Sequence, residues 1–409
     1  MLRTPEDYAL LSVEQARQRV LDSIAPLPIV EAPLLAALDR VLGETVCASF
    51  DVPPHDNSAM DGYAVRHADL ALGIQLPVAG AVAAGHPWVA PVKPGHALRI
   101  MTGAQMPPGA DTVVRFEHTT ACGAADAAAV RIDRVPRAGE NVRQAGEDVR
   151  AGQQVLMAGA LLRPQEIGML ASLGRTSIRV YRRPRVAVLS TGDEVVAAGQ
   201  PLLPGQIYDI NSYTVAAQIM RAGGDPLLLE PVPDRQDHLT ARLHRAMQQS
   251  DLIITSGGVS VGDLDLDKQV LVAEGRMDFW WVNMKPGKPL AFGHLGGVPL
   301  LALPGNPVAA MLSFHLFGRP AIHKLRGLSN IDEPVICAQL ADTIERKDGR
   351  RHYLRVWLEE REGQTVAHLT GDQGSGILSS LTRGQGVAVI PESCDHLPAG
   401  SMVKVLLLD

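Results

Sequence analysis

Strand-like and helix-like segments alternate from residue 182 to about residue 327, and this alternation restricts the fold more than any other feature. Runs of apolar, often β-branched residues lie at 185–191, 227–232, 251–255 and 299–304. Helical spacing lies between and after them, at 211–224, at 238–247, up to about Glu274 and at 307–325. Because parallel strands are joined by crossover helices, the pattern predicts a doubly wound parallel α/β sheet.

The remaining segments predict further domains on both sides of this sheet. Helical spacing occurs at 6–25, 31–42 and 163–174, whereas short apolar runs broken by Pro and Gly fill most of 50–140 and 330–409. We therefore expect a helical or linker N-terminal domain (1–49 and 140–181), an inserted small β-rich domain (50–139), the α/β domain (182–327) and a barrel-like C-terminal β domain (328–409).

Composition excludes several classes of function. The net charge of −6 argues against a nucleic-acid-binding surface as the main role of these 409 residues. No run of 18 apolar residues and no signal-peptide pattern is present, so we expect no membrane contact and a cytoplasmic location. The four cysteines are far apart, which predicts neither a zinc site nor a disulfide framework.

Residues with ligand-binding chemistry follow the predicted strands, at the end where open parallel sheets bind ligands. Glycines free backbone N–H groups for an anion, and carboxylates suit a divalent cation. The third loop alone is also compatible with a tight turn and solvated acids, but four such strand ends favour one shared crevice. The candidates are Ser190, Thr191, Gly192 and Glu194, then Asp234, then Ser256, Gly257, Gly258 and Asp265, and finally Pro304 and Pro307.

Two lysines lie on a stiff turn between the third loop and the last strand. Lys285 and Lys288 belong to the segment Lys-Pro-Gly-Lys-Pro at 285–289. Proline fixes φ and glycine permits the turn, so both ammonium groups can be held beside a phosphate or another oxyanion. Solvated surface lysines are the alternative, and the neighbouring crevice favours the binding role.

Polar loops also occur in the predicted β-rich domain and just after it. They contain Asp61, Thr102 and Asp148, in segments of Asp, Asn, Ser, Thr and Gly that form turns with exposed side-chain oxygens. From the residues alone, these loops are as compatible with a structural role as with a ligand-binding role.

Seven of these segments, in the same order, resemble the molybdopterin molybdenumtransferases of the MoeA type, to which the E domain of gephyrin is related. They lie at 51–65, 99–104, 146–148, 190–194, 256–262, 285–289 and 303–307. The resemblance implies a transferase that inserts molybdenum into adenylylated molybdopterin, consumes molybdate, releases AMP and requires Mg²⁺. It also implies an elongated homodimer whose cleft is shared between subunits, with a molybdopterin adenylyltransferase and molybdoenzyme maturation proteins as further partners.

The resemblance assigns roles to individual residues. Asp61, Thr102, Asp148, Glu194, Asp234 and Asp265 would be the polar active-site residues. Lys285, Lys288, Pro304 and Pro307 would border the oxyanion, and the looser matches at 349–355 and 371–375 would supply Arg355 and Ser375 to molybdate. Our hypothesis is that Glu194, Asp234 and Asp265 serve the metal. A departure at Leu266 leaves either Asp263 or Asp265 facing the site.

Two other functions fit parts of the chain. A molybdopterin adenylyltransferase shares the Ser-Gly-Gly and Pro-Gly-Asn-Pro loops, but it normally lacks the N-terminal acid loop and the closing β domain. A scaffold without turnover would use the same fold, yet the acids and lysines of the motifs are intact.

Overall fold

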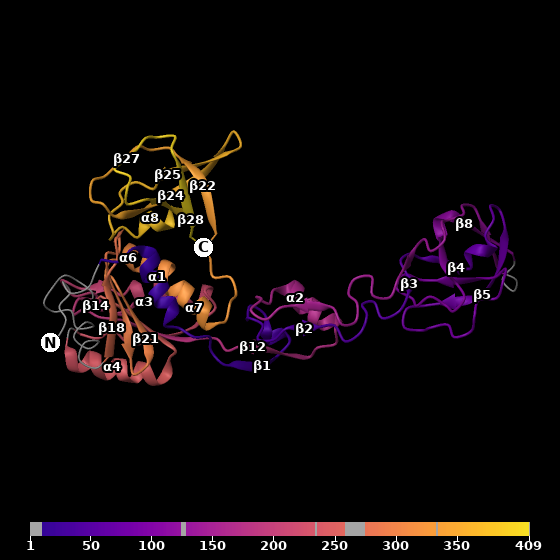
Figure 1. Ribbon diagram of the computed structural model, residues 1–409, viewed down its shortest axis with the longest axis horizontal. Helices are drawn as coiled ribbons and strands as arrows, with labels where there is room; N and C mark the ends of the chain where they lie inside the picture. Colours follow the sequence, from indigo (N-terminus) through magenta and orange to yellow (C-terminus); the bar gives the residue numbers. More distant parts are fainter. Residues whose placement is uncertain (1–9, 124–127, 234, 258–274, 333, 409) are drawn as a thin grey trace.

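The computed structural model describes residues 10–123, 128–233, 235–257, 275–332 and 334–408. The chain forms an elongated molecule, in which a small β-rich unit and a linker unit extend away from an α/β sheet unit that has a β-barrel packed above it (Figure 1). This architecture confirms the predicted fold class. No helix within the described ranges combines the length and the apolar character needed to cross a bilayer.

A six-stranded sheet forms the α/β unit, in the order β16-β13-β17-β21-β20-β18. The first four strands are parallel, and β20 and β18 add antiparallel at one edge. The strands are β13 (Arg185–Ser190), β16 (Asp225–Leu228), β17 (Leu252–Ser256), β18 (Gly275–Trp281), β20 (Pro289–Leu295) and β21 (Val298–Leu303). The sheet is therefore mixed, with the predicted parallel strands at one side.

Helices cover both faces of this sheet, as doubly wound folds require. Val186 and Val188 of β13 point to one core with α1, α3, α6 and α7, while Ala187 and Leu189 point to the other core with α4. The helices are α1 (Val13–Asp22), α3 (Asn211–Arg221), α4 (Gln236–Gln249), α6 (Pro307–Ser313) and α7 (Arg319–Leu325), the last two joined by a π-helical turn (Phe314–Gly318). A short pair, β14 (Val195–Val196) and β15 (Ile207–Tyr208), lies beyond β13.

Two expectations for the N-terminal segment differ from the structure. The helix expected at 31–42 is wrong: β1 (Ile29–Pro33) pairs with β12 (Ser177–Tyr181), and only a 3₁₀ turn follows at Leu35–Ala37. Tertiary pairing overrides helix propensity there. In addition, α1 packs into the core of the α/β unit, whereas the boundaries taken from the sequence grouped it with 29–49.

The linker unit contains β1, β12 and three further elements. These are α2 (Pro164–Ser172) and the pair β2 (Val46–Cys47) with β11 (Gln154–Leu156). Ala32, Leu42, Leu162 and Leu170 belong to the core that joins them.

The β-rich unit is built on a sheet in the order β7-β4-β6-β5-β9-β8, and β3 pairs with β10 next to it. Its strands are β3 (Asn57–Ser58), β4 (Gly62–Val65), β5 (Gln75–Val82), β6 (Ala97–Ile100), β7 (Thr112–Arg115), β8 (Thr119–Cys122), β9 (Ala129–Ile132) and β10 (Val142–Arg143). The apolar runs expected to be strands are therefore strands.

The C-terminal unit is a closed five-stranded barrel, because β24 pairs with β25 on one edge and with β26 on the other. Its elements are β22 (Val335–Leu340), β24 (Arg351–Arg361), β25 (Gln364–Leu369), α8 (Ser379–Thr382), β26 (Gly386–Ile390) and β28 (Met402–Leu407), with β23 (Ile344–Glu345) paired to β27 (His396–Leu397). A short strand before β20, β19 (Met284–Lys285), pairs with Arg351–His352 and so joins the sheet unit to the barrel.

Arg326, which follows α7, ties the linker unit to the α/β unit. Its side chain is 6% exposed and donates hydrogen bonds to the carbonyl oxygens of Ala222 (2.6 Å) and Asp39. Burial, together with the positive charge of Arg183, lowers the pKa of Arg326 to about 10, so the group stays charged at neutral pH. The two carbonyls depend on this one guanidinium.

We predict that Arg326→Met lowers the free energy of unfolding by about 2–4 kcal/mol, because the buried Ala222 carbonyl and the partly buried Asp39 carbonyl both lose this donor. Urea denaturation of the full chain measures the loss. Arg183→Met is the matched control: Arg183 is 42% exposed and 3.9 Å from Asp225, and such a surface pair contributes at most about 1 kcal/mol. Equal losses in the two variants would contradict this role of Arg326.

Candidate active site

The loops that follow β13, β17 and β21 contact one another at one edge of the sheet. The Thr191 N–H donates to the carbonyl of Ser256 at 2.9 Å, and the Gly257 N–H donates to that of Leu303 at 3.4 Å. The loop after β16 joins them, because the Gly192 N–H lies 3.3 Å from the carbonyl oxygen of Val232. The structure therefore brings together those predicted strand-end residues that it describes, and their roles with ligands stay predictions.

The buried serine hydroxyls at this edge hold the loops in place. Ser190 Oγ is 2.9 Å from both Asp209 Oδ1 and Ser212 Oγ. Ser256 Oγ donates to the carbonyl of Pro304 at 3.3 Å and accepts from Asn211 Nδ2 at 2.7 Å. Ser190 and Ser256 thus set the positions of the backbone that a ligand would meet.

Asn211 is a residue of this edge that the sequence interpretation missed. Helix α3 begins at Asn211, and Asp209 Oδ1 accepts from the Ser212 N–H. The Asn211 amide bridges Ser256 Oγ and the Gly305 carbonyl, both at 2.7 Å. In the sequence, Asp209 two residues before Asn211 at the expected helix start was the pattern that could have indicated this role.

Glycine is required at two of the predicted positions. Gly192 has φ of +139° and Gly257 has φ of +115°. A Cβ on Gly257 would lie 2.4 Å from the Thr191 carbonyl oxygen, so the two loops approach each other only because no side chain intervenes. Gly258 lies outside the described residues.

The proposed metal ligands are described only in part. Glu194 is exposed, and its carboxylate lies next to Gly192, where an added Cβ would meet Oε2 at 2.6 Å. Asp234, Asp263 and Asp265 lie outside the described residues. Within the described residues, no group of three or more His, Cys, Asp and Glu side chains is placed to hold a metal.

A cavity of about 520 Å³ lies where the sheet edge meets the barrel. Lys285, Lys288, Pro304, Arg355 and Ser375 line it, so it collects candidates from four separate segments. Pro307 is not among the lining residues; it occupies the first position of α6, beside the cavity. Arg350 and His352, which the sequence interpretation did not single out, add basic groups to the lining.

The two lysines have different neighbours. Lys285 Nζ lies 3.4 Å from Asp348 and is 56% exposed, whereas Lys288 Nζ lies 5.1 Å from the centre of the Trp281 ring. Partial burial opposes ionisation of Asp348, but the hydrogen bond and charge of His352 and the contact with Lys285 lower its pKa to about 2. Lys285 therefore faces an ionised carboxylate at neutral pH.

Arg355 is the most deeply buried cation of the cavity, with 1% of its surface exposed. Its Nε donates to Ser380 Oγ and its Nη2 to the Gly374 carbonyl, both at 3.0 Å. Burial lowers the pKa of Arg355, and the nearby Asp372 opposes this shift only in part. Because the ordinary pKa of arginine is above about 12, the guanidinium remains charged.

Ser375 brings the barrel loop onto the start of α6. Its Oγ accepts from Asn306 Nδ2 at 3.0 Å, and its carbonyl accepts from the Val308 N–H at 3.1 Å. The cavity wall therefore depends on contact between the two units.

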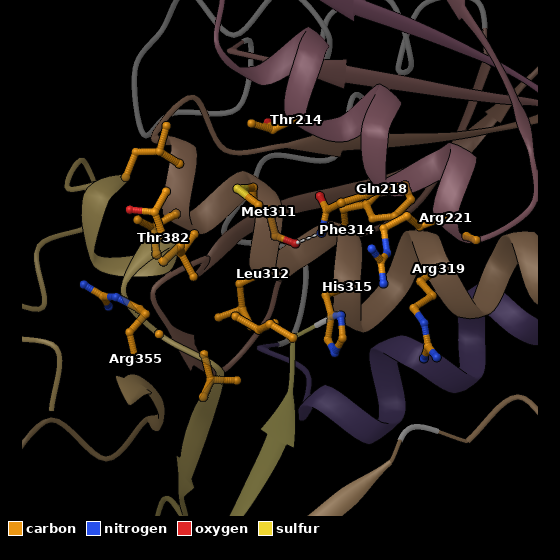
Figure 2. A pocket seen from close by; sticks show the side chains of 17 residues that line it. Thr214, Gln218, Arg221, Met311, Leu312, Phe314, His315, Arg319, Arg355 and Thr382 are labelled. Atoms are coloured by element: carbon orange, nitrogen blue, oxygen red, sulfur yellow. Dashed lines mark hydrogen bonds between the residues drawn. The ribbon is translucent and has the colours of Figure 1, made fainter. Parts of the chain in front are cut away.

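Arg355 also borders a second, mostly apolar cavity of about 300 Å³ on its other side. Figure 2 shows this cavity, with Met311, Leu312 and Phe314 between Arg355 at one end and Arg221 and Arg319 at the other.

The remaining candidates lie in the distant part of the chain. Asp61 Oδ1 accepts from the backbone N–H (2.7 Å) and the hydroxyl (2.9 Å) of Thr102, and these bonds lower the pKa of Asp61. Asp148 is exposed, and its N–H donates to the carbonyl of Val52 at 3.0 Å. Within one chain, the linker unit separates this β-rich region from the sheet edge (Figure 1).

Comparison with known proteins agrees with this arrangement. Three family models cover almost the whole chain: the MoeA N-terminal region (domains I and II) at 11–174, a probable molybdopterin-binding domain at 187–324 and the MoeA C-terminal region (domain IV) at 337–408. The chain is 37% identical over 402 residues to the molybdopterin molybdenumtransferase of Haemophilus influenzae, covering 97% of this chain and 98% of that protein. The chain belongs to the molybdopterin molybdenumtransferase (MoeA) family.

Other relatives support the same assignment. The Nostoc molybdopterin molybdenumtransferase is 39% identical over 399 residues, which cover 95% of this chain and 90% of that protein. A gephyrin from Dictyostelium discoideum is 32% identical, over 99% of this chain and 62% of that protein. The crystal structure of the molybdopterin biosynthesis MoeA protein from Pyrococcus horikoshii OT3 matches with a TM-score of 0.82 and 30% identity, over 98% of this chain and 100% of that one. The MoeA resemblance and the prediction of a transferase are thereby confirmed.

We predict that Gly257→Ala disrupts the sheet edge of this MoeA family member. The substitution combines a strained φ with a backbone clash, so we expect a loss of more than about 2 kcal/mol in the free energy of unfolding. Gly297→Ala is the control, because Gly297 has φ of +87° with nothing within 4 Å of its added Cβ, and it should lose only about 1 kcal/mol. Denaturant unfolding separates the two, and equal losses would mean that the close approach to Thr191 is unimportant.

Proposed function

We propose that this chain inserts molybdenum into adenylylated molybdopterin, with molybdate as the second substrate and AMP as a product. The observation that carries the proposal is the cavity between the sheet edge and the barrel, which Lys285, Lys288, Arg350 and Arg355 line. Asp372 is the one acidic residue among the lining residues that the structure describes. Such an excess of cationic donors suits a doubly charged oxyanion.

The neighbouring loops suit the phosphate part of the pterin substrate. Gly192 and Gly257 let the backbone of these two loops approach closely, and glycine-rich loops of this kind bind phosphate oxygens in many nucleotide-binding proteins. Lys285 and Lys288 follow in the adjacent cavity. The two substrates would therefore meet where the glycine loops and the lysines adjoin.

A magnesium ion is compatible with this edge. Mg²⁺ is usually held by one or two carboxylates together with substrate phosphates, and the exposed Glu194 beside Gly192 supplies one such carboxylate. Asp234 and Asp265 are the further ligands that we propose from their motifs. When bound, the ion would neutralise phosphate charge and polarise the phosphoanhydride bond.

The chain's own groups would orient the reactants. Arg355 and Ser375 would hold molybdate against the barrel, and the lysines would stabilise the negative charge that develops as the AMP leaving group departs. Pro304 and Pro307 would limit the movement of the loop that borders the oxyanion.

We also propose a homodimer with a shared cleft. Asp61, Thr102 and Asp148 belong to the same family motifs, yet the linker unit separates them from the sheet edge of their own chain. A second subunit would supply them to the cleft. We propose that this enzyme acts in the cytoplasm. Its partners there would be a molybdopterin adenylyltransferase and molybdoenzyme maturation proteins.

The alternatives have less support. An adenylyltransferase of the same fold would not use the barrel wall that supplies Arg355 and Ser375. A scaffold would not require a buried guanidinium held only by neutral acceptors among the described residues, since burying a charge is costly.

We predict molybdate-dependent AMP release when the purified full chain is incubated with adenylylated molybdopterin, molybdate and Mg²⁺. Arg355→Met should raise the KM for molybdate at least about 10-fold, since it removes a charged hydrogen-bond donor. Arg361→Met is the control, because Arg361 is exposed at the far end of the same strand. Pyrophosphate release from ATP and molybdopterin would instead support adenylylation, and binding without turnover would support a scaffold.

We predict that two inactive variants restore activity when mixed as dissociated and reassociated subunits. Asp61→Asn disables the distant loop and Lys288→Met disables the cavity. With random pairing, half of the dimers are mixed and each has one intact shared site, so activity should reach about one quarter of wild type. Molybdate-dependent AMP release measures it, each variant alone is the control, and no recovery in mixed dimers would contradict a shared cleft.

A further inference from the structure

Arg355 is fixed at its main chain as well as at its side chain. It lies within β24, where it pairs with Val387 of β26. Its N–H donates to Gln373 Oε1 at 2.8 Å, and its carbonyl accepts from the Thr370 N–H (3.1 Å) and from Gln373 Nε2 (3.2 Å). Gln373 therefore fastens the loop containing Gly374 and Ser375 onto the strand at Arg355.

Ser380 holds the guanidinium from the other side. It lies on α8 with 0% of its surface exposed. Its hydroxyl has one proton, which it donates to the Ile377 carbonyl at 2.6 Å, so its oxygen is left to accept from Arg355 Nε. The direction of the hydrogen bond between Ser380 and Arg355 is thereby determined.

Both acceptors of the guanidinium are uncharged. One is the Ser380 hydroxyl and the other is the Gly374 carbonyl. Most buried arginines in proteins pair with a carboxylate, which cancels their charge locally. In this cavity, two neutral contacts on different atoms fix the plane of the guanidinium, and the nearby Asp372 offsets its charge only in part, so most of that charge is left for another partner.

We propose that Ser380 is a positioning residue for the oxyanion substrate: it orients Arg355 through a neutral hydrogen bond and preserves the full charge of the guanidinium. The proposal rests on the proposed function, in which Arg355 binds molybdate. Ser380 acts through Arg355, while Gln373 positions the loop that carries Ser375. A carboxylate in place of the hydroxyl would hold Arg355 equally well and would compete with the anion.

The first test compares Ser380→Ala, Ser380→Thr and Ser380→Asp in the full-length protein. Calorimetric titration with sodium molybdate should show at least about 10-fold weaker binding for Ser380→Ala, because one of the two contacts that orient Arg355 is lost. Ser380→Thr keeps the hydroxyl and should stay within about 3-fold of wild type. Ser380→Asp should bind molybdate more weakly than Ser380→Ala, since its charge opposes the anion.

Ser379→Ala is the matched control, because Ser379 is the exposed neighbour on the same short helix. In the turnover assay, Ser380→Ala should raise the KM for molybdate while kcat and the KM for adenylylated molybdopterin stay within about 2-fold. A purely structural role would instead change all three constants together, in step with the melting temperature.

Three results would overturn the proposal. They are unchanged molybdate affinity in Ser380→Ala, failure of Ser380→Thr to restore it, and parallel loss of all kinetic constants. Titration with molybdate alone keeps this test separate from the proposed function. If wild type binds molybdate but releases no AMP, the proposed reaction fails and the role of Ser380 is still measured.

Discussion

Parallel pairing of β13, β17 and β21 is the constraint on which the rest of the site depends. It aligns the carboxyl ends of three strands, so the loops that follow them are close together and have to pack against one another. The loops can pack closely because Gly257 has no side chain, and Asn211 joins them by hydrogen bonds to Ser256 and Gly305. The barrel then packs on this edge through two contacts. Ser375 of a barrel loop accepts a hydrogen bond from Asn306, just before α6, and β19 pairs with β24.

The same organisation explains why the polar residues of the chain form two separate groups. The sheet edge and the barrel collect the cations, whereas Asp61 and Thr102 form a carboxylate–hydroxyl pair in the distant β-rich unit. The hydrogen bonds from Thr102 favour the ionised form of Asp61, so this unit presents a fixed negative charge at neutral pH.

The sequence predicted the features that depend on local pattern. Strand–helix alternation and strand-end glycines follow from side-chain periodicity and backbone freedom, and both are present in the structure. The failures came from tertiary contacts. Residues 31–42 have helical spacing, but β12 offers Ile29–Pro33 a strand partner 144 to 152 positions along the chain. The membership of α1 in the sheet core and the bridging role of Asn211 likewise depend on distant residues.

Arg355 and Lys285 show how one cavity can combine two kinds of cationic group. Lys285 is 56% exposed, and the attraction of its ionised neighbour Asp348 has to be partly given up when an anion binds. Arg355 is buried and held by uncharged oxygens, so no ion pair has to be broken for it to bind. Because reorganisation during binding costs free energy, the fixed guanidinium is the better group to define where the oxyanion lies. Lysine carries a compact charge on a long, rotatable side chain, so in the proposed reaction Lys285 would be the group that adjusts as charge moves between the reactants.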